Sequence, residues 1–502
     1  MRFFTVLYAT SRSVRVKNEV GRKVPKFGFC LLVCTSRGND VGLRSDCPKD
    51  AGTLLHGVCP AEFRISQLNS LCVFRMRECC TDVEALRETC ASQNLISMIS
   101  LCPCLISNHL ASWMKPEHVE KSLVMKFDEC FIRKEPLGVV LIIGAWNYPV
   151  QLVLVPLIGA IAAGNCAVVK PSELSDSTSS LLTELLPKYL DQSCFSVVCG
   201  GAKETTELLE ERFDHIFYTG GVSVARSVMR AASCHLTPVT LELGGKSPAL
   251  VEGSCDVTAT ARRLVWARFF NAGQSCVAPD YVLCSPETRR LLLPALRDCI
   301  TQLYGTEPRE SRDFGRIINQ RHFERIRDLL SNSQGRVEIG GETEEGERYI
   351  APTVLVDVSE SDPVMQEEIF GPVLPILTVE SLEEAINFIN RREKPLALYL
   401  YTGDSKHAPH LLSPSCPSPH SPSPLLPPLS SPLSLSLSPG SSGVGRYHGR
   451  FSFDTFSHQR SCVLRGFRLE WANQLRYPPY SEQKLERLLQ ATQERKWSCT
   501  LL

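Results

Sequence analysis

Thirty-three consecutive residues, Leu137–Val169, carry no charged side chain. An uncharged run of that length can form a transmembrane helix, but Asn147, Pro149 and Gly164 interrupt this one. Its apolar parts also differ in pattern, because the outer two are rich in β-branched residues and the middle one has helical spacing. The run therefore predicts a buried strand–helix–strand unit of a parallel sheet. Its parts are Leu137–Ile143, Val150–Ala163 and Cys166–Val169.

Strand-like and helix-like segments continue to alternate after this unit. Such alternation predicts an α/β fold with a doubly wound, Rossmann-type parallel sheet. The expected strands are Gly138–Ile143, Ala167–Val169, Ser196–Val198 and His215–Tyr218, and the expected helices are Thr178–Leu190, Glu204–Glu211 and Val224–Ser233.

A second α/β unit follows from Pro248. Its expected helices are Ala259–Phe270, Thr288–Tyr304 and Leu382–Ile389, and its expected strands are Pro352–Val358 and Val373–Thr378.

Composition marks the remaining boundaries. Residues 1–55 show no sustained period and are expected to be a disordered extension, whereas a helical pattern begins at Pro60–Arg75. Residues 409–440 hold ten prolines, ten serines and no charge, which predicts disorder. The first expected parts are a cofactor-binding domain at 56–243, which is cysteine-rich and atypical at 78–110, and a catalytic domain at 244–408. A Pro/Ser-rich segment follows at 409–441. The last expected parts are an ordered segment at 442–480, which packs on the cofactor domain, and a tail at 481–502.

Charge and cysteine content exclude several classes of protein. Lys plus Arg and Asp plus Glu both number 54, so there is no basic excess to indicate nucleic-acid binding. The 22 cysteines are scattered, without a signal peptide or matched pairs at zinc-ligand spacing. We therefore expect no metal site, and mostly buried, reduced thiols.

Three residues carry the parts needed for covalent chemistry on a carbonyl carbon. Cys276 lies 34 residues after Glu242 and 129 after Asn147. A thiolate can attack, an amide can hold the oxyanion, and a carboxylate can activate water. With a bound hydride acceptor, this set would oxidise an aldehyde. Reactivity of the thiol requires a depressed pKa or a nearby base.

Long motifs surround these residues. They are Leu241–Pro248, Phe270–Cys276 and Pro363–Pro372 (PVMQEEIFGP). With them the chain resembles the aldehyde dehydrogenases of class 3, and most closely the B-type members, over Ser112–Leu400 and Gly443–Leu502. The resemblance implies that Cys276 is the nucleophile, that Glu242 is the general base, and that Asn147 holds the oxyanion beside the Cys276 N–H. The implied path is a thiohemiacetal, hydride transfer to nicotinamide, and hydrolysis of a thioester.

The resemblance also implies a cofactor site. Lys170 and Glu173 follow a parallel strand and are expected to meet the adenosine ribose. A carboxylate there disfavours a 2′-phosphate, so NAD is expected, and NADP is possible in class 3. Glu368 and Phe370 are expected to hold the nicotinamide ribose.

The expected phosphate turn departs from the family pattern. Gly221, Ala225 and Arg226 stand where the family usually has Ser, Gly and Lys. We expect the added methyl of Ala225 to crowd the cofactor and to lower its affinity. The turn residues are Gly220, Gly221, Val222, Ser223, Val224 and Ala225.

The C-terminus, Cys499–Leu502 (CTLL), fits a prenylation box, and its final Leu favours geranylgeranyl. Ser481–Gln493 precedes it with a helical pattern that has Leu485, Leu488 and Leu489 on one face. One prenyl chain binds membranes weakly, so a second signal is needed. The expected location is the cytoplasmic face of the plasma membrane, endoplasmic reticulum or lipid droplets, and otherwise the cytoplasm. Medium- or long-chain fatty aldehydes are the expected substrates.

Two regions depart from the family and leave an alternative open. Residues 78–110 stand in place of family helices, and 409–440 in place of part of the oligomerisation and substrate-tunnel region. An intact fold is expected to form a homodimer. The alternative is a catalytically impaired, prenylated protein that acts by interaction at a membrane surface, and a cofactor-independent thiol esterase is conceivable only as a side activity.

Overall fold

The computed structural model describes residues 60–77, 106–121, 125, 128–404, 440–466 and 474–492. All of them belong to one unit, Asp40–Leu502. Several predictions fall outside the described residues. They are the extension 1–55, positions 78–105 of the atypical region, nearly all of the Pro/Ser-rich segment, and Cys499.

The first sheet is the doubly wound sheet that the sequence predicts. Its strand order is β16-β7-β6-β3-β4-β5, and every neighbouring pair is parallel except β16 with β7. The chain therefore enters at β3 and winds outward in both directions, which places a switch point beside β3. The strands are β3 (Val139–Ile143), β4 (Cys166–Lys170), β5 (Phe195–Val197), β6 (His215–Thr219), β7 (Val239–Glu242) and β16 (Gly443–Val444).

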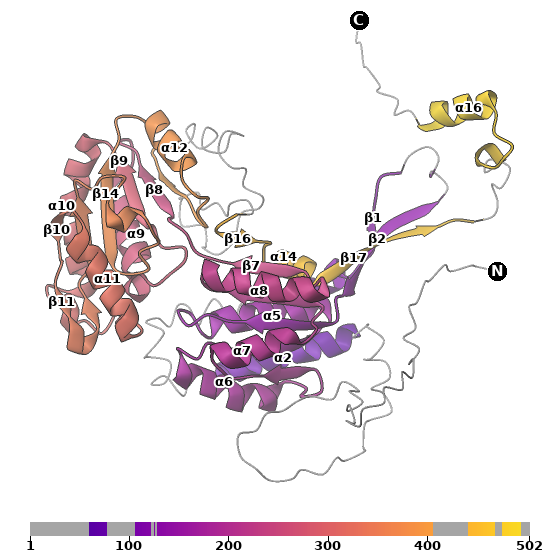
Figure 1. Cartoon of the computed structure of the whole chain (residues 1–502), viewed down its shortest axis with the longest axis horizontal. Helices are drawn as coiled ribbons and strands as arrows, with labels where there is room; N and C mark the ends of the chain where they lie inside the picture. Colours follow the sequence, from indigo (N-terminus) through magenta and orange to yellow (C-terminus); the bar gives the residue numbers. More distant parts are fainter. Residues whose placement is uncertain are drawn as a thin grey trace, which may run out of the picture. The chain divides into compact units, whose positions relative to one another are not determined.

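The uncharged run is explained by burial on both faces of this sheet. Val140 and Ile142 of β3 face one hydrophobic cluster, and Leu141 and Ile143 face another. Helices α2 (Ala61–Arg77), α5 (Gln151–Ala163), α6 (Asp176–Tyr189) and α14 (Arg450–Thr455) contribute to the first cluster, and α7 (Ala202–Glu210) and α8 (Val222–His235) to the second (Figure 1).

Helix α5 is buried almost all round. Every residue from Leu152 to Ala163 is buried, so a charge on any face of the helix would be desolvated. Gly164 ends the helix in a left-handed conformation at φ 92°, where a side chain would be strained and would also meet Arg64. The predicted strand–helix–strand unit is therefore confirmed.

No helix among the described residues combines the length and the apolar character that crossing a membrane requires.

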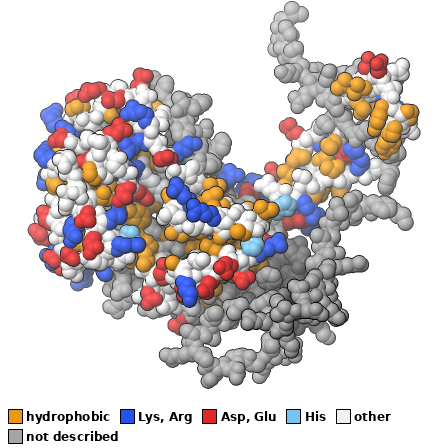
Figure 2. Space-filling view, in the orientation of Figure 1, with side chains coloured by type: hydrophobic (Ala, Val, Ile, Leu, Met, Phe, Trp, Pro, Cys, Tyr) orange, Lys and Arg blue, Asp and Glu red, His pale blue; other side chains and the backbone are white. Residues whose placement is uncertain are grey.

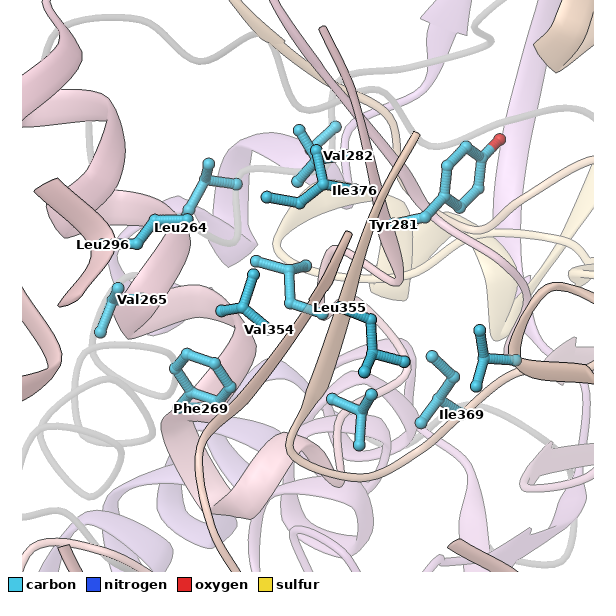
Figure 3. Packing of buried hydrophobic residues seen from close by; sticks show 14 of the residues in the cluster. Leu264, Val265, Phe269, Tyr281, Val282, Leu296, Val354, Leu355, Ile369 and Ile376 are labelled. Atoms are coloured by element: carbon cyan, nitrogen blue, oxygen red, sulfur yellow. The ribbon is translucent and has the colours of Figure 1, made fainter. Parts of the chain in front are cut away.

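The second sheet has the order β10-β13-β14-β9-β8-β15, parallel except for β10. Side chains from its strands and helices converge on one large core (Figure 3). The strands are β8 (Pro248–Val251), β9 (Tyr281–Cys284), β10 (Arg336–Ile339), β13 (Thr353–Val356), β14 (Val373–Thr378) and β15 (Tyr399–Tyr401), and the helices are α9 (Val257–Phe269), α10 (Pro286–Tyr304), α11 (Gln320–Asn332) and α12 (Leu382–Asn390).

A third, antiparallel sheet was not predicted. Strand β2 (Glu129–Pro136) lies between β1 (Glu117–His118) and β17 (Ser457–Leu464). Beyond β17, Arg465 makes a bidentate ion pair with the buried Asp128, with Nη2 2.5 Å from Oδ2. The shorter elements are β11 (Thr343–Glu344), β12 (Tyr349–Ile350), α16 (Glu482–Thr492) and the 3-10 turns η2 (Phe270–Gly273), η3 (Pro308–Glu310), η4 (Glu345–Glu347), η5 (Pro363–Met365) and η8 (Gln474–Arg476).

The chain after the Pro/Ser-rich segment returns to the first sheet. Strand β16 pairs with the end of β7, with Gly443 opposite Glu242. Helix α14 packs on α5 so closely that a Cβ on Gly159 would lie 2.6 Å from the Cβ of Ser452. One expectation needs correction, because residues 106–113, at the end of the atypical region, form a helix whose Ile106 and Leu110 enter the core.

Candidate active site

The three predicted catalytic residues lie on separate segments at the end of the first sheet. Glu242 is the last residue of β7, and Asn147 lies in the connection from β3 to α5. Cys276 follows α9 and η2 in the connection to β9. Parallel strands bring their carboxyl ends to one edge, which is where the first two residues stand.

The turn before Cys276 is strained. Asn271, Ala272 and Gly273 have φ values of 53°, 51° and 74°, which lie in the left-handed region. For the two residues with a Cβ this conformation costs on the order of 1–3 kcal/mol each. A Cβ on Gly273 would also lie 2.2 Å from the carbonyl oxygen of Gly371, so the position requires glycine. The strain ends the helix abruptly and turns the chain toward Cys276.

Gln274 holds this turn in place. Its Nε2 donates to the carbonyls of Asn271 at 3.1 Å and Arg316 at 3.0 Å, and its Oε1 accepts from the N–H of Ile318 at 2.9 Å. The side chain is 3 % exposed, so these bonds are shielded from water. Sequence reasoning did not assign this role to Gln274, although the residue lies inside the quoted motif.

Asn147 is tied to the nucleophile turn from both ends. Its Nδ2 donates to the carbonyl of Gln274 at 3.2 Å, and its own carbonyl accepts from Nδ2 of Asn271 at 2.8 Å. The side chain is 5 % exposed. A side-chain amide carries two hydrogens, and the Gln274 contact uses one. The amide thus stands beside the backbone that leads to Cys276, oriented by the same turn.

Burial dominates the ionisation of the site. It raises the pKa of the Cys276 thiol to about 12, and the charges of Glu368 and Glu242 raise it further. Burial likewise raises the pKa of Glu242 to about 8 and that of Glu368 to about 8. A depressed thiol pKa, one of the two routes to reactivity, is therefore absent here. Of the two expected routes to reactivity, the raised pKa leaves the one through a nearby base.

The expected adenosine-ribose residues are Lys170, the last residue of β4, and Glu173 just beyond it. The Nζ of Lys170 donates to the carbonyls of Pro171 at 2.9 Å and Gly200 at 3.0 Å, and it lies 3.3 Å from Oε2 of Glu173. The Lys170 side chain is buried, whereas that of Glu173 is half exposed. The carboxylate is thereby held at the surface beside a fixed ammonium group.

The turn after β6 fits a phosphate-bearing cofactor. Within the described part of the chain, the buried hydroxyl of Thr219 has no hydrogen-bond partner. Gly220 has a φ of 156°, and the space beside Gly221 is open. Helix α8 starts at Val222 without a side-chain cap, so its first N–H groups point toward that space. Thr219 lies directly before the expected turn and was not singled out from the sequence.

Ala225 corrects an expectation. Its side chain is 2 % exposed and packs in the cluster beneath α8 with Leu141, Ile216 and Leu241. The methyl therefore lies between the helix and the sheet, where the third glycine of such turns permits close packing. The structure argues against a loss of cofactor affinity through crowding by this methyl.

Glu368 and Phe370 lie on a turn that meets the end of β7. The Glu368 carboxylate lies so close to Gly244 that a Cβ there would be 2.1 Å from its Oε2, and it accepts a hydrogen bond from the N–H of Gly245. Phe370 has a φ of 49° and packs edge-on against Trp146 at 5.4 Å. Both residues predicted for the nicotinamide ribose thus border the same edge as Glu242.

Comparison with known proteins identifies the chain. The sequence pattern of the aldehyde dehydrogenase family matches residues 104–414. Aldehyde dehydrogenase family 3 member B1 of Rattus norvegicus is 54 % identical over 460 residues, which cover 88 % of this chain and 95 % of the relative. The chain belongs to the aldehyde dehydrogenase family.

Solved structures agree with the fold of this aldehyde dehydrogenase. The substrate-bound AldH of Staphylococcus aureus is 37 % identical and superposes with a TM-score of 0.79, over 88 % of this chain and 97 % of that one. An aldehyde dehydrogenase of Mycobacterium tuberculosis complexed with NAD+ is 26 % identical, with a TM-score of 0.67 over 81 % and 86 % of the two chains. The protein is an NAD(P)-dependent aldehyde dehydrogenase, with NAD as its expected cofactor.

Proposed function

We propose that this aldehyde dehydrogenase oxidises apolar, medium- or long-chain aldehydes through a covalent bond to Cys276. The observation that carries the proposal is the convergence of three groups on one turn. Asn147 bonds the backbone of Gln274, and the ionisation of the Cys276 thiol responds to the charge of Glu242. A nucleophile, an oxyanion donor and a base are therefore within reach of one carbonyl group.

Each residue has a distinct role in the proposed chemistry. The sulfur of Cys276 bonds to the aldehyde carbon as its proton passes to Glu242 and from there to solvent, and the Asn147 amide with the Cys276 N–H stabilises the oxygen that gains charge. The bound cofactor supplies the acceptor for the hydride. Glu242 then takes a proton from water, whose oxygen attacks the thioester and releases the acid and the free thiol. Because its pKa is raised to about 8, Glu242 can accept and return protons near neutrality.

Aromatic side chains next to the nucleophile favour an apolar substrate. Tyr148 stacks on Phe270 with ring centroids 6.2 Å apart, and Phe270 contacts Trp266 at 5.5 Å. Trp266 is 45 % exposed, so the aromatic row runs from the buried site to the surface. The hydroxyl of Tyr399 donates to the carbonyl of Val277, the residue after Cys276, and is close enough to the thiol for their charges to interact. An alkyl chain that packs against these rings would remove apolar surface from water, which favours its binding.

The decisive experiment measures NADH formation from a long-chain aldehyde by the full chain and by Cys276→Ser. We expect activity in the parent and none in the variant. Cys199→Ser is the matched control, because Cys199 is an exposed cysteine on another loop. Activity that survives in Cys276→Ser would refute the covalent route. A folded parent without activity would instead favour the alternative of an impaired, membrane-surface protein.

We further propose that a prenyl group on Cys499 anchors the enzyme to the cytoplasmic face of a membrane, with α16 as the second signal. Leu485 and Leu489 of α16 are 57 % and 51 % exposed, and Tyr480 before it is 77 % exposed. Figure 2 shows hydrophobic side chains gathered on this helix, which Figure 1 labels. A lipid surface would remove these side chains from water and add to the weak affinity of one prenyl chain.

Cell fractionation tests the anchor. The parent is expected in the membrane fraction, and Cys499→Ser is expected in the supernatant. The double change Leu485→Ser with Leu489→Ser should weaken membrane binding while prenylation persists. A Cys499→Ser protein that stays in the membrane fraction would contradict the lipid anchor, whereas activity on soluble aldehydes would be unaffected by this result.

A further inference from the structure

A buried charge cluster lies behind the proposed active site. Nη1 of Arg268 lies 2.8 Å from Oδ1 of Asp280, and Nζ of Lys246 lies 2.5 Å from Oδ2. The side chains are 1 %, 2 % and 10 % exposed in the order Arg268, Asp280, Lys246. One carboxylate is thus shared by two cations away from water.

The members of the cluster come from the two segments that carry the nucleophile and the base. Arg268 lies eight residues before Cys276 and Asp280 four residues after it, so the pair closes the loop that presents the thiol. Lys246 lies four residues after Glu242, on the exit from β7. A displacement of the Asp280 side chain would therefore move both segments.

The cluster also holds the turn that bears Glu368 and Phe370. Arg268 donates through Nη2 to the carbonyl of Gly371, and the N–H of Ile369 lies 3.3 Å from both oxygens of Asp280. Lys246 donates to the carbonyls of two further residues of this segment, Val364 at 2.8 Å and Glu367 at 3.0 Å. Every one of these contacts reaches backbone atoms, so the charges set the path of the chain.

Gly273 joins the two sides of the arrangement. Its Cα packs on the carbonyl of Gly371, the same group that Arg268 binds, and a Cβ at this position would lie 2.2 Å from that oxygen. The strained nucleophile turn therefore rests directly on the turn of Glu368. The position of one turn therefore fixes the position of the other.

Stability alone is a weak reason to build such a cluster. Taking three charges out of water is costly, and apolar residues of similar volume often serve a fold equally well. Within the described residues the Nε of Arg268 also lacks a partner, which adds to that cost. An arrangement whose hydrogen bonds and ion pairs join three separate segments of the chain is better explained by the positions that it imposes.

We propose that Arg268, Asp280 and Lys246 are positioning residues that set the relative placement of Cys276, Glu242 and the Glu368 turn. The inference rests on the proposed function, because it concerns the same reacting groups. The hydrogen bonds and ion pairs of the cluster join its members to one another and to backbone carbonyls. Its effect is on the geometry of attack, where a displacement of about 1 Å can lower a rate by roughly 100-fold.

The test uses Arg268→Lys in the full chain. Lysine keeps the charge beside Asp280 but lacks the fork that reaches both Asp280 and Gly371 at once. We expect kcat to fall by about 10- to 100-fold, and KM for NAD to rise as well, because the cluster also holds the turn of Glu368 and Phe370. Alkylation of Cys276 by iodoacetamide, which needs neither cofactor nor aldehyde, should slow as well.

Asp128→Asn is the matched control, because Asp128 is a buried carboxylate paired with an arginine in the sheet of β1, β2 and β17. It should lower the unfolding temperature with kcat kept within about twofold. The double variant Arg268→Met with Asp280→Asn removes both charges of that pair together, while Lys246, which loses its charged partner, keeps its hydrogen bonds to the carbonyls of Val364 and Glu367. It too should fold with a reduced kcat.

The outcomes separate this inference from the proposed function. A folded Arg268→Lys or double variant with the parent's kcat and alkylation rate would overturn the positioning role, even though Cys276→Ser is inactive. An equal loss of kcat in Asp128→Asn would also overturn it, since the effect would then be one of stability. Activity in Cys276→Ser would instead defeat the proposed function itself.

Discussion

The two partly buried carboxyls near the thiol, those of Glu242 and Glu368, offer a sharp test of the base. Burial raises the pKa of both Glu242 and Glu368 to about 8, and both charges act on Cys276. Only Glu242 is proposed to activate water. We therefore expect the rate to rise with pH through about 8 in the parent, to lose this rise in Glu242→Gln, and to keep it in Glu368→Gln.

The pKa sets the size of the effect. A base whose pKa is about 8 is roughly 9 % ionised at pH 7 and roughly 91 % at pH 9, so the rate should increase about tenfold between them and then level off. Loss of the base should lower the rate at pH 9 by about 10²- to 10⁴-fold. A thiol with a pKa of about 12 would give a different profile, because its ionisation keeps rising beyond pH 9 without a plateau.

The assay is kcat/KM for aldehyde at saturating NAD, measured by NADH absorbance from pH 6 to 10. Single-turnover hydrolysis of the acyl-enzyme, measured over the same range, reports the step assigned to Glu242. The reasoning fails if Glu242→Gln keeps a plateau with a midpoint near 8, or if Glu368→Gln removes it. A parent rate that climbs steadily to pH 10 would also refute it, because the thiol would then control the profile.

Three further outcomes follow from the same geometry. Asn147→Ala should lower kcat by about 10²- to 10³-fold by removing an oxyanion donor, as steady-state kinetics would show, and a kcat within twofold of the parent would exclude that role. Gly273→Ala places a methyl 2.2 Å from the carbonyl of Gly371 at a φ of +74°, so calorimetry should show destabilisation by about 1–3 kcal/mol, and an unchanged melting temperature would contradict the packing. The pKa of Glu242 is raised from 4.5 to about 8 in the folded protein. Between pH 4.5 and pH 8 the folded protein therefore keeps a proton on Glu242 that the unfolded chain has released, and the free energy of unfolding falls as pH rises across that window. Urea unfolding should therefore find Glu242→Gln more stable than the parent at pH 8 by about 2–4 kcal/mol, with little difference at pH 4, and equal stability at pH 8 would show that the carboxyl is well solvated.

The sequence predicted well the elements whose residues are buried by their immediate neighbours in the sheet. The expected strand His215–Tyr218 and helix Leu382–Ile389 differ from β6 and α12 by one residue. A parallel strand buried on both faces is apolar throughout, and an amphipathic helix shows its period, so both signals are local.

The third sheet was not predicted, because its strands carry no local signal in the sequence. Strand β2 contains Arg133, Lys134 and Glu135, so it shows no apolar run. Its partner Ser457 lies 321 residues beyond Pro136, which it pairs with. A half-exposed strand is specified by the strand it pairs with, and the local sequence does not contain that information.

The sequence by itself determined the α/β fold and singled out Cys276, Glu242 and Asn147 as candidate catalytic residues, because long motifs and an uncharged run are properties of consecutive residues. Tertiary structure alone decided their chemical state. The pKa values near 12 and 8 arise from burial by segments distant in the chain, and the Ala225 methyl proved to face the core for the same reason. Desolvation and packing depend on everything that surrounds a group, and that environment exists only after the separate segments have folded together.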